Sequence, residues 1–146
     1  MNILAIDIGT SSARGILYDG EGRSQFIHPV TYSVYFPGEN LVEQDPGDFD
    51  SAVAEICAAG AAWAKDRGQT VDALSLTAQR SSIIPVNKQG EPLRPAIMWQ
   101  DKRNEGIVAA LRPREKKIYA LTGARINTVF SGTKMTWLRR EEPEIY

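Results

Sequence analysis

Short apolar runs broken by turn residues dominate the beginning of the chain. Residues 3–8 (ILAIDI) and 13–18 (ARGILY) each form such a run, and only the four residues from Gly9 to Ser12 separate them. This spacing predicts a β-hairpin. A third extended segment over 24–35, rich in β-branched and aromatic residues, follows a glycine-containing turn. We therefore expect the chain to open as a three-stranded meander.

The spacing becomes helical after the meander. Asp45-Pro46 marks the start of one long helix and Gly68 marks its end. Short apolar segments over 71–77 and 83–86 then indicate that the sheet continues. The remaining pattern is helical in three pieces: 101–111, 115–121, and a helix that starts at Ser131 or Thr133 and runs to Arg140. This order of elements predicts an α/β domain with a mixed sheet and flanking helices.

Composition bounds the class of protein. The 146 residues, of which 42% are hydrophobic and 24% charged, fit one globular domain with its own core. The formal net charge of -1 gives neither a basic field for nucleic acid nor an acidic tail. No apolar run approaches the roughly 20 residues that span a bilayer, and no secretory leader precedes the first strand. We expect a cytoplasmic protein without nucleic-acid or membrane partners; assembly into homo-oligomers stays open.

Cysteine and histidine usage narrows the chemistry further. The only cysteine, Cys57, lies in an alanine-rich helical pattern and is expected to pack as a small apolar residue. No disulfide can form within the chain, in keeping with a reducing compartment. One histidine and one cysteine cannot supply the usual nitrogen and sulfur ligands of zinc. Any bound metal would therefore have oxygen ligands.

The turn between the first two runs carries the most suggestive chemistry. Neither a dinucleotide-binding nor a P-loop glycine motif occurs in the chain. Instead, a strand bearing Asp7 leads into Gly9, which allows close backbone approach, and then into the hydroxyls of Thr10, Ser11 and Ser12. Such a turn can cradle phosphates while the acid holds magnesium. It can equally be a plain hairpin loop whose polar residues satisfy its own backbone.

Four stretches, in order, resemble the FGGY carbohydrate kinases and cover almost the whole chain. IDIGTSSARGILYD is similar to the family's first phosphate motif, and LVEQDPGDF to its E-Q-D-P helix entry. QRSSIIPVNKQGEPLRPAIMWQDKR is similar to its substrate-side segment with the W-x-D-x-R signature, and TGARINTVFSGTKMTWL to its S-x-x-K-x-x-W-L segment. The resemblance implies a ribonuclease-H-like, actin-like ATPase fold in which ATP phosphorylates a hydroxyl of a sugar or polyol.

The resemblance also implies roles for individual residues. Asp7 would position Mg²⁺, and Arg14 would reach toward the transferred phosphoryl group. Three residues would lie along the nucleotide phosphates: Gly9, Thr10 and Ser11. On the acceptor side, the residues implied to bind the sugar or polyol are Arg80, Ser81, Trp99 and Asp101.

Each acceptor-side residue also has a plainer interpretation. Trp99 can be a core aromatic, and Arg80 can form a surface salt bridge. Asp101 can cap the following helix while fixing Arg103. Lys134 is expected to be a solvated or capping residue rather than a ligand.

The sequence departs from individual members of the family. Glycerol kinases carry an acid where this chain has Ser81 and a tyrosine where it has Val129, whereas xylulokinases have a methionine-histidine pair at Arg80-Ser81. The acceptor thus stays open among ketoses, polyols and related sugars.

The family's general base and adenosine pocket would fall outside these residues. Residues 1–146 are therefore expected to be the N-terminal part of the first kinase domain, which needs the remainder of the same chain and is inactive alone. A non-catalytic sugar or nucleotide sensor of the same fold is the alternative function, and an actin-like polymer or chaperone ATPase is a weaker one.

Overall fold

The computed structural model describes residues 1–146, and these divide into two compact units. The first unit comprises residues 1–33 and 47–79, and the second comprises residues 34–46 and 80–146. The chain length alone gave the expectation of one domain. That both units belong to the first domain of a larger kinase stays a prediction.

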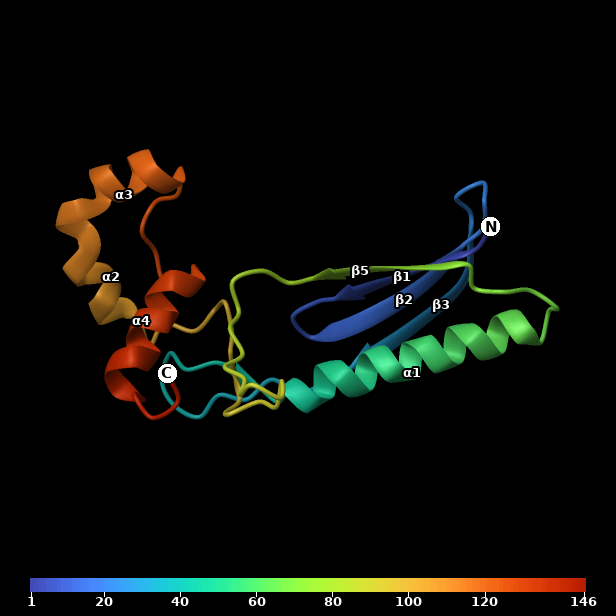
Figure 1. Cartoon of the computed structure of the whole chain (residues 1–146), viewed down its shortest axis with the longest axis horizontal. Coiled ribbons are helices and arrows are strands. Elements are labelled where there is room, and N and C mark those ends of the chain that lie inside the picture. The colour runs from blue at the N-terminus through green and yellow to red at the C-terminus, as the bar shows by residue number, and fades with distance from the viewer. The chain divides into compact units, whose positions relative to one another are not determined.

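The first unit is built on a four-stranded mixed sheet in the order β3-β2-β1-β5 (Figure 1). Its strands are β1 (Ile3–Ile8), β2 (Ser12–Tyr18), β3 (Ser24–Thr31) and β5 (Ala73–Ala78). Strand β1 pairs antiparallel with β2 and parallel with β5, while β2 pairs antiparallel with β3. The predicted meander and the mixed character of the sheet are both confirmed.

Helix α1 (Pro46–Lys65) lies along one face of this sheet, as Figure 1 shows. Leu4, Ile6 and Leu17 of the sheet form a buried cluster with Ile56 of the helix. Gly15 lets the helix approach the sheet this closely because it has no side chain. A Cβ at this position would lie only 2.2 Å from the Ile56 Cγ2 atom. The sheet and the helix thus meet at small residues.

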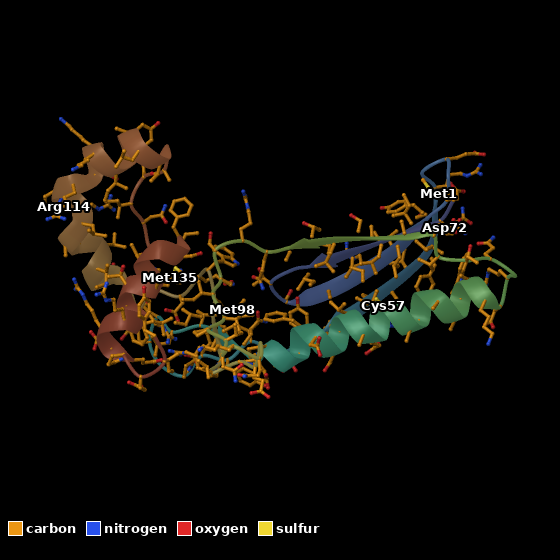
Figure 2. All side chains as sticks on the ribbon, viewed as in Figure 1. Met1, Cys57, Asp72, Met98, Arg114 and Met135 are labelled. Carbon is orange, nitrogen blue, oxygen red and sulfur yellow. The ribbon has the colours of Figure 1, made fainter.

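Cys57 lies on α1 (Figure 2) and packs, partly buried, against the cluster. Its predicted role as a small apolar residue is confirmed.

The second unit joins a two-stranded antiparallel sheet to several short helices. Strand β4 (Glu43–Gln44) pairs with β6 (Ala96–Ile97). The helices are α2 (Glu105–Leu111), the single 3₁₀ turn η1 (Arg112–Arg114), α3 (Glu115–Thr122) and α4 (Ser131–Glu141). Its buried apolar residues include Ile97, Met98, Val108 and Leu138.

Two predicted extended segments differ from expectation: one strand is shorter than predicted, and the other does not form. Strand β3 ends at Thr31, and Tyr35 makes only an isolated bridge to Glu43. Residues 83–86 form no strand; Ile83 and Val86 make isolated bridges to Ile97 and Pro92. Pro85 lies inside this segment and has no backbone N–H to donate to a ladder.

Candidate active site

A tight turn joins β1 to β2 and contains the hydroxyl residues identified from the sequence. The Gly9 N–H donates to the Ser12 carbonyl at 2.9 Å. A Cβ at Gly9 would lie 3.0 Å from that same carbonyl oxygen, so a larger residue would have to displace the turn. Ser11 is exposed at its tip. The backbone and hydroxyl groups of this turn are therefore presented on a constrained hairpin.

Asp7 and Arg14 flank the turn on one face of the sheet. They are direct cross-strand partners in the β1–β2 register, and both side chains are exposed. Leu4 and Ile6 of β1 are buried against α1. Because side chains alternate along a strand, Asp7 points to the opposite face, together with Arg14. The turn thus has a carboxylate and a guanidinium beside it, and the phosphate site that they were predicted to form stays a prediction.

Strand β5 and the segment after β3 hold the turn from either side. The Thr10 hydroxyl donates to the Gln79 side-chain oxygen at 3.2 Å. On the other flank, the Tyr32 hydroxyl donates to the Gly9 carbonyl. Neither contact could be predicted from the sequence, because both partners lie far along the chain and are brought to the turn only by the sheet.

The chain contains no cluster of three or more histidine, cysteine, aspartate or glutamate side chains able to hold a metal. A Mg²⁺ ion bound with a nucleotide needs less, since it takes one or two carboxylates and completes its octahedron with water and phosphate oxygens. Asp7 is one exposed carboxylate beside a turn rich in hydroxyls and backbone N–H groups. The donor set therefore fits Mg²⁺ that arrives with a phosphate ligand.

Trp99 begins the acceptor-side group in the second unit. This residue is 36% exposed, which contradicts its interpretation as a core aromatic. The backbone N–H of Trp99 donates to the Ser82 hydroxyl at 3.0 Å, so the structure brings this residue beside the 80–82 segment. Arg80 is exposed and forms no ion pair, and Ser81 has a left-handed backbone with φ of 71°. The plain surface-salt-bridge interpretation of Arg80 is not observed.

Asp101 is fully buried and serves as a structural anchor. Its carboxylate accepts from the Val42 N–H at 2.6 Å and from the Arg103 backbone N–H at 2.9 Å. The Arg103 guanidinium also donates to both Asp101 oxygens at 2.9 Å. The expectation that Asp101 fixes Arg103 is confirmed. Its expected role as a helix cap is wrong, because α2 begins at Glu105 after Asn104.

The Asp101–Arg103 pair continues into a larger ion network. The Arg103 guanidinium donates to the Glu43 carboxylate at 2.7 Å, and Arg94 donates to the same Glu43 oxygen. Arg94 also reaches Glu142 at 2.6 Å. Burial acts to lower the pKa of Arg103, whereas its partners Asp101 and Glu43 act to raise it. The net effect is a raised pKa. The network ties β4, α4 and the segment before α2 together.

Lys134 corrects a sequence-based expectation. It was expected to be solvated or to cap a helix, but it is fully buried on α4. Its ammonium donates to the carbonyls of Thr128, Val129 and Trp99 at 2.5, 3.0 and 3.4 Å. Burial lowers its pKa to about 8. Position in an S-x-x-K pattern could not reveal this, because the carbonyls that bind the ammonium come from the segment just before α4 and from Trp99, 35 positions earlier.

The predicted site residues fall into two groups. Those of the phosphate side lie in the first unit: Asp7, Gly9, Thr10, Ser11 and Arg14. Those of the acceptor side lie in the second unit: Arg80, Ser81, Trp99 and Asp101. Their individual ligands stay predictions.

Residues 2–146 match the family model described as the FGGY family of carbohydrate kinases, N-terminal domain. A glycerol kinase of Leptothrix cholodnii is 37% identical over 144 residues, covering 97% of this chain and 29% of that protein. The crystal structure of Plasmodium falciparum glycerol kinase with ADP has a TM-score of 0.92 and 29% identity, over 99% of this chain and 29% of that one.

A xyloylose kinase from Brucella ovis has a TM-score of 0.91 and 25% identity, over 99% of this chain and 30% of that one. These likenesses confirm the predicted ribonuclease-H-like, actin-like ATPase fold. The chain spans less than a third of the length of each of these relatives. None of its helices is long and apolar enough to cross a membrane.

Proposed function

The chain belongs to the FGGY family of carbohydrate kinases, and we propose that the kinase containing it transfers the γ-phosphoryl group of ATP to a hydroxyl of a sugar or polyol. The observation that carries the proposal is the β1–β2 turn with Asp7 and Arg14 on one sheet face beside it. The Plasmodium falciparum neighbour, a glycerol kinase whose structure was determined with ADP, supports the use of an adenine nucleotide.

On the nucleotide side, each residue has a distinct task. The Gly9 backbone allows close approach of phosphate oxygens, and the Ser11 hydroxyl donates to them. Thr10 lies along the phosphates between these two residues, with its own hydroxyl donating to Gln79. Arg14 supplies positive charge for the transferred group. Asp7 holds Mg²⁺, which when bound neutralises charge on the phosphates.

On the acceptor side, Arg80 and Ser81 hydrogen-bond hydroxyls of the acceptor, and the exposed indole of Trp99 contacts its C–H face. Asp101 acts indirectly, because its oxygens are already engaged by Val42 and Arg103. It therefore fixes the segment that carries Trp99. A polyol or ketose suits these groups, since it offers adjacent hydroxyls and an apolar face.

The remaining parts of the reaction belong to the rest of the kinase. We assign the general base and the adenosine pocket to residues outside this chain, which spans under a third of its relatives. Residues 1–146 alone would then bind substrates incompletely and turn over no ATP, because phosphoryl transfer depends on assembled positioning and charge.

The test is an acceptor screen with the full-length kinase. Polyols, pentuloses, hexuloses and gluconate are each incubated with Mg-ATP, and ADP release is measured against a reaction without acceptor. Acceptor-dependent release supports the proposal. Binding of a sugar without any turnover would favour the sensor, and turnover independent of all acceptors would favour an ATPase.

A further inference from the structure

Tyr32 makes two contacts with the turn between β1 and β2. Its backbone N–H donates to the Ser11 carbonyl at 3.3 Å, one step beyond the last β2–β3 partners, Ser12 and Thr31. Its hydroxyl donates to the Gly9 carbonyl. One residue thus binds the carbonyl oxygens of both Gly9 and Ser11, on either side of Thr10.

The ring of Tyr32 is itself held in place. It meets Phe49 of α1 edge-on, with 5.1 Å between ring centroids and 84° between ring planes. It also packs against the buried cluster of the sheet and α1. Because an aromatic ring with this support has few rotamers available, its hydroxyl is aimed at the turn before any ligand arrives.

The hydroxyl remains a donor over the working pH range. Burial, with a smaller contribution from the charge of Asp7, raises the pKa of Tyr32 to about 12. The neutral phenol is therefore the state that contacts Gly9. This contact matters for the turn, since glycine is the residue with the greatest backbone freedom to lose.

The opposite flank of the turn is fixed by a different residue. Thr10 donates its hydroxyl to Gln79, which follows β5, and the Gln79 N–H donates to the Ile8 carbonyl at 2.8 Å. Tyr32 provides the matching restraint on the β3 side. The two restraints together leave the exposed tip at Ser11 as the part of the turn open to a ligand.

We propose that Tyr32 is a positioning residue that preorganises the β1–β2 turn for nucleotide phosphates, an inference that rests on the proposed kinase function. It does not touch the nucleotide; it fixes the Gly9 and Ser11 carbonyls, and so the direction of the turn's N–H groups and hydroxyls. Preorganisation of this kind lowers the ordering cost of binding.

The direct test compares wild type, Tyr32→Phe and Tyr119→Phe in the full-length kinase. Tyr32→Phe keeps the ring packing and removes only the hydroxyl donor. Loss of one hydrogen bond should raise the KM for ATP by about 3- to 10-fold, with the acceptor KM unchanged. Tyr119, an exposed tyrosine on α3, is the matched control and should leave both constants unchanged.

A second measurement reads the turn without turnover. Hydrogen exchange followed by mass spectrometry, without nucleotide, should show faster exchange over residues 9–12 in Tyr32→Phe. The same peptides of the Tyr119→Phe variant should match wild type. Faster exchange confined to the turn distinguishes positioning from a general loss of stability, which would accelerate exchange throughout the sheet.

The inference and the proposed function fail in different ways. Unchanged ATP KM and unchanged exchange in Tyr32→Phe, in a kinase that turns over, overturn the role of Tyr32 alone. Equal rises in the ATP and acceptor KM also overturn it. A wild-type protein that binds Mg-ATP in calorimetry but phosphorylates no acceptor overturns the transfer reaction, while weaker Mg-ATP binding by Tyr32→Phe would still support the role of Tyr32.

Discussion

Asp7 and Arg14 face one another across the β1–β2 ladder, an acid and a base side by side on the sheet face away from α1. Both side chains are exposed at the turn rather than buried in an ion pair of the core. An exposed pair of this kind adds little to stability. We therefore propose that its placement beside the β1–β2 turn serves ligand binding rather than folding.

Asp7→Asn removes the charge that we propose holds Mg²⁺ while preserving the shape of the side chain. We expect kcat to fall by about 100-fold or more, with the free energy of unfolding almost unchanged. Steady-state kinetics over a range of Mg²⁺ concentrations measures the effect. Asp66→Asn, an exposed carboxylate just after α1, serves as the control. Near wild-type kcat in Asp7→Asn would refute the metal role.

Arg80→Ala tests the acceptor side. Removing hydrogen bonds from a charged donor to substrate hydroxyls should raise the acceptor KM by about 10-fold or more. The KM for ATP should stay within about 2-fold of wild type, because no phosphate contact is lost. Arg114→Ala, an exposed arginine of η1 (Figure 2), is a matched control. A rise confined to the ATP constant would place Arg80 on the nucleotide side instead.

Lys134 should give stability an unusual pH dependence. Its pKa is about 8 in the folded chain and near 10.5 when unfolded. Between these values the unfolded state binds more protons, so this group's contribution to stability rises with pH. Urea unfolding of wild type and Lys134→Met should show the difference moving in favour of wild type from about pH 8 to 10.5. A pH-independent difference would mean that the ammonium is not desolvated.

Arg103→Met tests the buried ion network. Arg103 is only 5% exposed and is the cation nearest to the fully buried Asp101. Leaving that carboxylate unpaired should lower the free energy of unfolding by about 3 to 5 kcal/mol. Arg112→Met breaks an exposed pair with Glu115 and should cost less than about 1 kcal/mol. Equal losses in the two variants would show that the network contributes no more than a surface pair.

The local sequence pattern predicted much of the fold but less of the candidate site. The hairpin followed from turn spacing, and α1 from Asp45-Pro46 and helical spacing, because these depend on neighbouring residues. Residues 83–86 have strand composition, but tertiary placement and Pro85 leave them with only isolated bridges. Composition alone could not foresee that outcome.

The contacts that support the candidate site could not be predicted from the sequence. The Tyr32 hydroxyl meets Gly9 across 23 positions, and Lys134 meets the Trp99 carbonyl across 35. Neither residue type signals such a partner. What determines these contacts is which strands and loops are brought together, and that depends on the whole chain.

Strand β5 has a consequence for handling the chain by itself. It is an edge strand whose six residues are all exposed, with Leu74 and Leu76 on its surface and no charge or proline to block pairing. Such an edge is a template for intermolecular β-pairing. We therefore expect the 146-residue chain, when produced by itself, to self-associate through β5 as its concentration rises.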